Sequence, residues 1–274
     1  MLSVIIVNYK TPELLYDCIL SINENPPECE YEIIVADNNS GDGSERVSDI
    51  PYVTYLALPK NGGFSYANNK GLEKAKGDII LFLNPDTFVL KGTLLACINE
   101  LLSDKDLGCV GCRLLMENGR LDLACKRGFP TLKNSFFKFT GIDKLLPSPF
   151  FSGYNLLHLN EEEKHYVDCV VGAFMMIPRA VLEEVGSFDE RFFMYGEDID
   201  LCYRIKNAGY KILYDGTHTI FHRKRASSKK SSVAKKAFYD SMWLYYDKHF
   251  SKKHGKIVSG IVKLSIKTLE KLKG

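Results

Sequence analysis

Residues 79–87 have the sequence IILFLNPDT, in which an apolar run leads directly into a polar turn. Five consecutive apolar side chains predict a buried strand, of the kind found in parallel sheets. Ligands bind at the carboxyl ends of the strands in such α/β sheets. Asp86 follows the strand immediately, so its carboxylate is expected to hold a metal or a ligand there.

The rest of the first half repeats an alternation of strand and helix. Apolar runs predict strands at residues 4–7, 33–35 and 52–58. Helical spacing predicts a helix beginning near Thr11, after the first of these strands, and another beginning near Phe64, before the strand at residues 79–83. This rhythm favours an α/β fold with a Rossmann-like, mostly parallel central sheet flanked by helices.

The second half is less regular. Strands are predicted at residues 110–114, 167–177 and 210–214, and short helices at 180–185 and 198–208. Residues 125–160 are rich in Phe, Pro and Gly and show no clear period. We expect this segment to be a long loop that shapes a substrate cleft or acts as a flexible lid.

The length and composition are those of an ordinary globular protein. The 274 residues suffice for one large domain or two small ones, and 45% of them are hydrophobic and 26% charged. The residues after Met1 resemble a strand, and no long apolar run occurs, so we expect neither a secretory signal nor a membrane-spanning helix. The eight scattered cysteines are therefore expected to be reduced thiols in the cytoplasm.

The charge is distributed unevenly along the chain. Residues 223–274 contain 15 Lys and Arg against three acidic residues, although the whole chain carries only +2. From about residue 251, apolar residues recur at steps of three and four with lysines mostly on the other side, which predicts a basic amphipathic helix. We favour the anionic cytoplasmic face of a membrane as its partner. A helix packed on the body is the alternative, and nucleic acid is disfavoured because no aromatic residues are interleaved with the lysines.

A second polar cluster follows an aromatic run. Residues 192–204 read FFMYGEDIDLCYR, so that Glu197, Asp198 and Asp200 place three carboxylates within four residues. A charged carboxylate beside apolar side chains loses hydration energy, so it usually has a compensating partner or a functional role. Such a carboxylate is suited to act as a general base. The alternative is that all three stabilise the first turn of the helix that begins here.

Five segments together resemble family 2 glycosyltransferases of the GT-A fold, and in particular the rhamnosyltransferase-type branch. They occur in the order seen in that family: SVIIVNY at 3–9, VADNNS at 35–40, NGGFSYANNKG at 61–71, LNPDT at 83–87 and GSFDERFFMYGEDIDLCYR at 186–204. The resemblance covers about residues 1–225 and implies a GT-A domain over that range. Its nucleotide-sugar-binding half would be 1–100 and its acceptor-binding half 101–225, followed by a basic helical extension at 226–274.

The resemblance implies that a nucleotide-sugar donor binds at the ends of the first strands. Asp37 would accept a hydrogen bond from the base, with capping of its own loop as the alternative. The backbone of Val7 and the ring of Tyr9 would flank the base, and simple packing of Tyr9 is the alternative. The other residues expected to contact the donor are Asn61, Gly62, Asn68, Asn84, Glu197 and Arg204.

The resemblance also implies a divalent metal ion. Asn84-Pro85-Asp86 resembles the Asp-x-Asp motif of the family with Asn in the first position, so Asp86 would bind Mg²⁺ or Mn²⁺ at the diphosphate. A plain turn residue is the alternative for Asp86. His222 is expected to be a second metal ligand, and His218 competes with it for that role.

Glu197-Asp198 resembles the Glu-Asp pair of the family, which makes Asp198 the base that removes the proton from the acceptor hydroxyl. A single base without a covalent intermediate implies inversion of configuration. Gly172, Ala173, Phe174 and Asp200 are expected to line the acceptor or sugar pocket.

These interpretations predict a cytoplasmic, peripherally membrane-bound, metal-dependent inverting glycosyltransferase. The expected donor is dTDP-L-rhamnose, with a UDP-sugar as the alternative, and the expected acceptor is a lipid-linked saccharide of a bacterial surface polysaccharide. One rival is a nucleotidyltransferase, which would need a glycine-rich basic loop after Val7. Another is a non-catalytic nucleotide-sugar-binding module. No nucleic-acid partner is expected, and the oligomeric state is left open.

Overall fold

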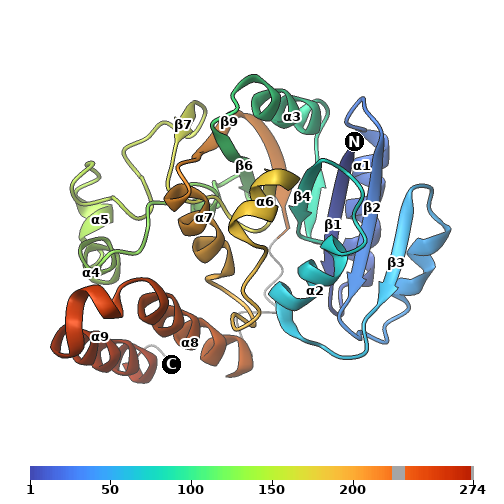
Figure 1. The fold of residues 1–274 in the computed structure, drawn as a ribbon. Coiled ribbons are helices and arrows are strands. Elements are labelled where there is room, and N and C mark those ends of the chain that lie inside the picture. Colours follow the sequence, from blue (N-terminus) through green and yellow to red (C-terminus); the bar gives the residue numbers. More distant parts are fainter. Residues whose placement is uncertain (224–231, 273–274) are drawn as a thin grey trace.

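The computed structural model describes residues 1–223 and 232–272 as an α/β structure in which helices flank one central sheet (Figure 1). In this part of the chain the sheet has nine strands in the order β3-β2-β1-β4-β8-β6-β9-β5, with β7 paired to β9. The strands are β1 (Leu2–Asn8), β2 (Tyr31–Asp37), β3 (Val53–Ala57), β4 (Ile79–Leu83), β5 (Thr87–Val89), β6 (Leu107–Met116), β7 (Lys164–Tyr166), β8 (Phe174–Pro178) and β9 (Lys211–His222).

The helices lie between these strands and beyond the last of them. They are α1 (Pro12–Glu24), α2 (Gly63–Leu72), α3 (Thr93–Ser103), α4 (Leu132–Thr140), α5 (Ile142–Leu145), α6 (Arg179–Val185), α7 (Glu197–Asn207), α8 (Ser232–His249) and α9 (Ser251–Leu272), with short 3₁₀ turns at Ser44–Asp49 and Leu123–Cys125.

The first four strands form a parallel half-sheet. β1 pairs in parallel with β2 and with β4, and the register places Asn8 opposite Asp37 at the carboxyl ends of β1 and β2. The predicted alternation of strand and helix in the first half is confirmed. Because these strands end at one edge, the polar turns that follow them gather there.

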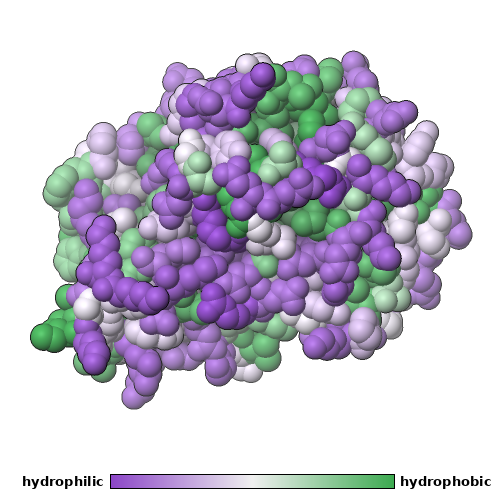
Figure 2. All heavy atoms as spheres, viewed as in Figure 1, coloured by the Kyte–Doolittle hydropathy of each residue, from purple (hydrophilic) through white to green (hydrophobic). Residues whose placement is uncertain are grey.

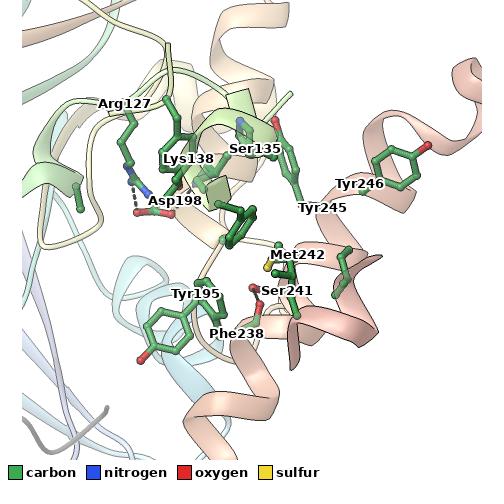
Figure 3. A pocket seen from close by; sticks show the side chains of 18 of the residues that line it. Arg127, Ser135, Lys138, Tyr195, Asp198, Phe238, Ser241, Met242, Tyr245 and Tyr246 are labelled. Atoms are coloured by element: carbon green, nitrogen blue, oxygen red, sulfur yellow. Dashed lines mark hydrogen bonds and ion pairs between the residues drawn. The ribbon is translucent and has the colours of Figure 1, made fainter. Parts of the chain in front are cut away.

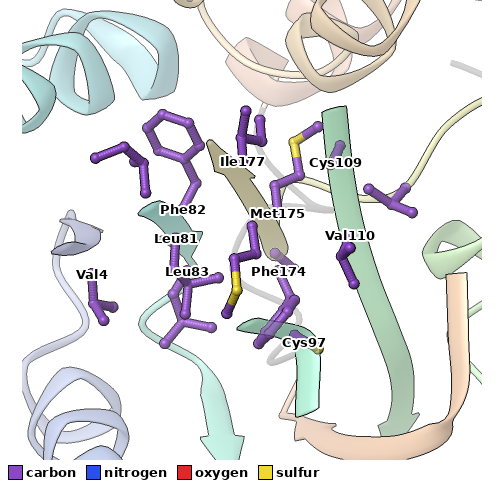
Figure 4. Packing of buried hydrophobic residues seen from close by; sticks show 14 of the residues in the cluster. Val4, Leu81, Phe82, Leu83, Cys97, Cys109, Val110, Phe174, Met175 and Ile177 are labelled. Carbon is purple, nitrogen blue, oxygen red and sulfur yellow. The ribbon is translucent and has the colours of Figure 1, made fainter. Parts of the chain in front are cut away.

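The second half makes the sheet mixed. β8 lies antiparallel between β4 and β6, whereas β6 and β9 run parallel to each other. The side chains of β4 and β8 form the middle of the hydrophobic core, where Leu81 and Phe82 lie near Met175 and Ile177 (Figure 4). The buried strand predicted for residues 79–83 is thus present, and its continuation holds Asp86 at the edge of the sheet.

The strand predicted at residues 167–177 is wrong for its first seven residues. Only β8, from Phe174 onward, is a strand. The preceding turn takes another path because the backbone N–H of Gly172 donates to Oδ2 of Asp198, at 3.2 Å, instead of to a neighbouring strand.

The long loop predicted at residues 125–160 is also wrong, because the segment contains α4 and α5. Thr131 caps α4 by accepting a hydrogen bond from the N–H of Asn134, and Gly141 ends it with φ of 78°. Phe137 packs against Phe151 with 5.0 Å between ring centroids. The segment therefore forms a wall of the molecule with its own aromatic packing.

The tail contains two helices where one was expected. α9 confirms the predicted C-terminal amphipathic helix, whereas α8 was not predicted. The two helices pack side by side (Figure 1), with a break in α9 at Gly255, whose φ is 77°. The domain boundary expected at residues 225 and 226 lies outside the described residues.

The outer side of α9 exposes apolar side chains next to lysines. Ile257, Ile261 and Leu264 are 82%, 61% and 67% exposed. The visible face of the molecule is largely hydrophilic, with hydrophobic spheres at the lower left, where Figure 1 places α9 (Figure 2). None of the helices in the described ranges combines the length and apolar content needed to cross a membrane.

Candidate active site

A cavity of about 1220 Å³ lies where the turn after β4 meets α7. It collects predicted site residues that are up to 138 positions apart in the sequence. The predicted residues that line it are Asn84, Asp86, Gly172, Ala173, Glu197, Asp198 and His222. The expected metal ligands and the expected base therefore share one space.

The Asp86 carboxylate and the His222 ring face each other in this cavity. Oδ1 of Asp86 lies 3.2 Å from Nε2 of His222, which ends β9. The other ring nitrogen, Nδ1, lies 2.9 Å from Oδ2 of Asp122. His218, the competing candidate, lies 2.8 Å from Asp215 instead. The geometry therefore selects His222 as the neighbour of Asp86.

His222 carries a positive charge between its two carboxylates. Burial alone would lower its pKa, but the hydrogen bonds with Asp122 and Asp86 raise the pKa to about 9. A carboxylate oxygen and an imidazole nitrogen are suitable ligands for a divalent cation, which would replace the proton between them. Residues 1–223 and 232–272 contain no group of three or more His, Cys, Asp or Glu arranged to hold a metal. Asp86 and His222 would therefore supply two metal ligands, and phosphate oxygens and water would complete the coordination.

Asp198 is held by an ion pair that the sequence did not reveal. Its Oδ2 accepts hydrogen bonds from Nη2 of Arg127, at 2.6 Å, and from the N–H of Gly172. Oδ1 accepts from the N–H of Ile199 at 2.8 Å. Burial of Arg127 opposes its charge, but the adjacent Asp198 carboxylate raises its pKa above the usual value. These contacts fix the Asp198 carboxylate on the cavity wall.

Glu197, the neighbour of Asp198, favours its protonated form. Burial is the main cause that raises the pKa of Glu197 to about 8, and the nearby Asp198 carboxylate acts in the same direction. Its Oε2 is buried without a hydrogen-bond partner among the described residues. At neutral pH Glu197 is therefore a protonated acid at the cavity wall.

Asp37 is buried at the end of β2, where its oxygens already accept hydrogen bonds. Asn8 donates to Oδ1 at 2.7 Å, and the N–H of Ser40 donates to Oδ2 at 2.9 Å. Both contacts stabilise the loop, as the alternative reading expected. The Tyr55 side chain also interacts with this carboxylate. Recognition of a base by Asp37 stays a prediction. Tyr9 is 44% exposed beside this loop, and Val7 is buried in β1.

The Asn-Gly-Gly turn lies next to the same loop. The N–H of Gly62 donates to Asn38, and the N–H of Gly63 donates to Asn61 at 3.0 Å. Gly63 has φ of 89°, and a Cβ there would lie 2.3 Å from the carbonyl oxygen of Phe193, so only glycine fits. Asn68 is buried and donates to the carbonyl of its own helix at Phe64. Its contact with the donor remains untested.

Like the predicted nucleotide-binding residues of the first strands, three further predicted residues lie away from the cavity. Phe174 is fully buried in β8, because it faces the core beside β4. Asp200 is also fully buried, and Lys248 and His249 of α8 each approach its Oδ1 to 2.7 Å. Arg204 donates to Asp200 and to the carbonyls that end α6. Asp200 and Arg204 thus connect α7 to α8 and α6 rather than lining the pocket.

Three side chains of this site were missed in the sequence. Arg127 and Asp122 follow β6 in a segment without helical or strand periodicity, and Lys138 lies on α4, which was read as loop. Their partners are far away in the sequence: Asp198 is 71 residues from Arg127, and His222 is 100 residues from Asp122. The cap at Thr131 was the one local signal, since it predicts the start of α4.

A sheet with an aspartate–imidazole pair and a second, arginine-paired aspartate near its carboxyl edge is typical of α/β proteins that bind ligands at that edge. The chain belongs to glycosyl transferase family 2, whose family model matches residues 3–186.

Two curated relatives illustrate the family. The chain is 29% identical over 221 residues to the low-salt glycan biosynthesis hexosyltransferase Agl10 of Haloferax volcanii, covering 77% of this chain and 63% of the relative. It is 24% identical over 221 residues to the N-acetylglucosaminyl-diphospho-decaprenol L-rhamnosyltransferase of Mycobacterium tuberculosis, covering 76% of this chain and 71% of the relative. The chain thus spans less than two thirds of the length of the first.

A solved structure supports the fold. The mannosyltransferase PcManGT from Pyrobaculum calidifontis, in complex with GDP-Man and Mn²⁺, superposes with a TM-score of 0.64. The match covers 99% of this chain and 70% of that chain at 18% sequence identity. The expected α/β fold of the GT-A type, including its helical C-terminus, is confirmed.

Proposed function

We propose that this protein is a metal-dependent inverting glycosyltransferase that moves a sugar onto a hydroxyl of a lipid-linked saccharide. One observation carries the proposal: Asp86 and His222 share a single cavity with Asp198. Membership of glycosyl transferase family 2 supports sugar transfer. The name of the Mycobacterium tuberculosis relative supports L-rhamnose as the transferred sugar and a diphospholipid-linked saccharide as acceptor. The first candidate donor is dTDP-L-rhamnose. A UDP-sugar is the second candidate donor.

Asp198 acts as the base in this proposal. Its carboxylate accepts the proton of the acceptor hydroxyl while that oxygen attacks the anomeric carbon and the bond to the nucleoside diphosphate breaks. Attack from the side opposite the leaving group inverts the configuration. Arg127 would hold the Asp198 carboxylate in position through the 2.6 Å contact between Nη2 and Oδ2. Protonated Glu197 is placed to donate a hydrogen bond to the sugar.

Asp86 and His222 would hold Mg²⁺ or Mn²⁺, which when bound neutralises charge on the departing diphosphate. Asp37, Tyr9 and the Asn61-Gly62 turn would bind the nucleotide within residues 1–100. The cavity beyond Asp198 would bind the acceptor and is formed mainly from residues 101–225 together with the C-terminal extension. We also propose that α9 attaches the protein to the cytoplasmic face of a membrane, because its exposed apolar residues border lysines.

The first experiment is a thermal-shift screen with dTDP-rhamnose, UDP-glucose, UDP-galactose and UDP-GlcNAc, each with Mn²⁺ or with EDTA. A ligand at a hundredfold excess over its Kd stabilises the folded state by about 2.7 kcal/mol. We expect one donor to raise the melting temperature, and only in the presence of the metal. If no donor does so in either condition, the assigned donor site is wrong.

Asp198→Asn separates an enzyme from a binding module. General base catalysis contributes about 10²- to 10⁴-fold, so transfer is expected to fall by that factor while the donor-induced thermal shift persists. Unchanged transfer would remove Asp198 from its role as base.

A further inference from the structure

The far half of the cavity is apolar and is built by three helices. Phe136 and Phe139 line it from α4, Met242 and Tyr245 from α8, and Val262 and Leu269 from α9. Figure 3 shows Met242 and Tyr245 across the cavity from the Arg127–Asp198 pair. The catalytic wall and the apolar wall therefore belong to one continuous space.

This space is too large for an acceptor sugar alone. Its volume of about 1220 Å³ exceeds the range of about 300–1,000 Å³ that is usual for a small ligand. Tyr9 and Asp37, which are expected to contact the base, do not line it, whereas Asn84, Asp86 and Glu197 bring the sugar-diphosphate end of the donor site to its catalytic wall. The apolar half is thus available to a part of the acceptor that extends away from Asp198.

One cation lies between the two halves. Lys138 of α4 lines the cavity, and its Nζ is 3.6 Å from the centroid of the Tyr154 ring. No carboxylate of residues 1–223 and 232–272 forms a salt bridge with it. Burial and, to a smaller extent, Arg127 lower its pKa to about 8, while the more distant Asp143 carboxylate acts in the opposite direction. A bound anion would offset both effects, since an opposite charge favours the ammonium form.

The cavity also opens toward the exposed side of α9. Ile261 and Leu264 line it although they are 61% and 67% exposed, so they lie at its mouth. Lys267 and Lys271 lie on the same helix, one turn or two further on. Apolar residues bordered by lysines are typical of helices that lie in a membrane interface. A chain leaving the cavity here would pass directly into the lipid.

We propose that this cavity binds a lipid diphosphate, with the apolar chain between α4, α8 and α9 and the diphosphate at Lys138. The attached sugar then reaches Asp198. The position of the sugar at Asp198 rests on the proposed function. Binding of the lipid diphosphate in the cavity does not depend on that function.

The test uses farnesyl diphosphate, farnesol and inorganic pyrophosphate as probes in isothermal titration calorimetry of the full chain. EDTA is present, so that a metal at Asp86 does not bind the diphosphate. Lys138→Gln removes the cation, and Lys133→Gln on the same helix, outside this cavity, is its control. Val262→Asp charges the apolar wall, and Ile257→Asp adds the same charge to α9 outside the cavity.

Lys138→Gln is expected to weaken binding of farnesyl diphosphate by about tenfold or more and to leave farnesol unaffected, because only a charged contact is lost. Val262→Asp is expected to weaken the binding of both farnesyl diphosphate and farnesol. The controls Lys133→Gln and Ile257→Asp are expected to leave the affinity for both probes unchanged. Circular dichroism checks folding, and Met242→Gln replaces Val262→Asp if that variant unfolds. Equal affinity in the wild type and these variants, or pyrophosphate binding as tightly as farnesyl diphosphate, would overturn the proposal.

Titration of dTDP-rhamnose and the UDP-sugars with Mn²⁺ distinguishes this inference from the proposed function. Donor binding without farnesyl diphosphate binding refutes the lipid site alone. Farnesyl diphosphate binding that depends on Lys138 and Val262, without binding of any tested donor, supports the lipid site and refutes the proposed donors.

Discussion

Asp122 fixes the orientation of His222: its Oδ2 accepts a hydrogen bond from Nδ1 at 2.9 Å, which turns Nε2 toward Asp86. A carboxylate behind an imidazole in this way sets the tautomer and raises the basicity of the nitrogen that binds a metal. Asp122 is itself held in place, because its Oδ1 accepts from the N–H of Ala124. The proposed metal site thus depends on a residue that does not touch the metal.

Replacing Asp122 with Ala should therefore weaken metal binding without removing either ligand. Loss of such a supporting contact lowers metal affinity by about 10- to 100-fold. The Kd for Mn²⁺ can be measured in the presence of dTDP or UDP from the electron paramagnetic resonance signal of the unbound ion. Glu117→Ala, at an exposed position in the hairpin after β6, is the control. Identical Mn²⁺ affinity in Asp122→Ala and the control would show that His222 does not need this support.

The ion pair between Arg127 and Asp198 should dominate the stability of the cavity wall. Both side chains are 8% exposed. Removing one member of such a pair leaves a buried charge without compensation, so Arg127→Gln is expected to destabilise the protein by about 3–5 kcal/mol. Urea denaturation measures this loss. Arg191→Gln, which breaks the pair of a 61% exposed arginine with Asp189, is expected to cost less than about 1 kcal/mol.

A double-mutant cycle tests whether that loss comes from the pair itself. Arg127→Gln combined with Asp198→Asn removes both charges, so the double variant should be more stable than the sum of the single effects by about 1–3 kcal/mol. Strictly additive effects would mean that Arg127 acts through its other contacts, which include the hydrogen bonds to the carbonyl of Val170 and to Sγ of Cys169.

Some residues of this site could be predicted from the sequence and others could not. The apolar run before Asp86 and the carboxylate cluster at Asp198 were recognisable because each is contiguous, and both reach the cavity. Arg127 and Asp122 were not, because their partners lie on α7 and at the end of β9 and are joined to them only by the folded chain. Asp200 was expected to line the pocket because it belongs to the same carboxylate cluster as Asp198. Its position around α7 directs it toward α8 instead, and the linear sequence does not show which side of the helix is covered.

Glu197 should make stability depend on pH in a definite direction. The pKa of Glu197 is raised from 4.5 to about 8 in the folded protein, first by burial and then by Asp198. Between these values the folded state keeps a proton that the unfolded chain has lost, so the free energy of unfolding falls as the pH rises through this interval. Urea denaturation at intervals between about pH 5 and about pH 8 should show the decline.

Glu197→Gln removes this titration and should flatten the profile below about pH 6.5, because the decline above that pH also contains His222, whose pKa is raised from 6.5 to about 9. Glu183→Gln, at an exposed position on α6, should leave the decline as it is in the wild type. A decline of the same size in Glu197→Gln would assign the pH dependence to another group.

Membrane binding should depend on the lysines that border the apolar stripe of α9. Lys256, Lys267 and Lys271 are exposed, and each lysine near an anionic surface contributes about 1 kcal/mol. Lys263 is a less suitable choice because its Nζ already lies 4.7 Å from the centroid of the Trp243 ring. Replacing the first three lysines together with Gln should strongly reduce co-sedimentation with vesicles that contain anionic lipid, and the effect should shrink at high salt because surface charges are screened.

The control for this variant changes charge by the same amount on another part of the surface. Lys74, Lys76 and Lys91 are exposed and distant from α9 in the sequence. If net charge alone attracts the protein to vesicles, replacing these three with Gln reduces sedimentation as much as the α9 variant does, and α9 is then no membrane anchor. If α9 lies in the interface, only its own lysines matter, and Ile257→Ser with Leu264→Ser should also weaken binding to vesicles without anionic lipid, since those side chains are 82% and 67% exposed.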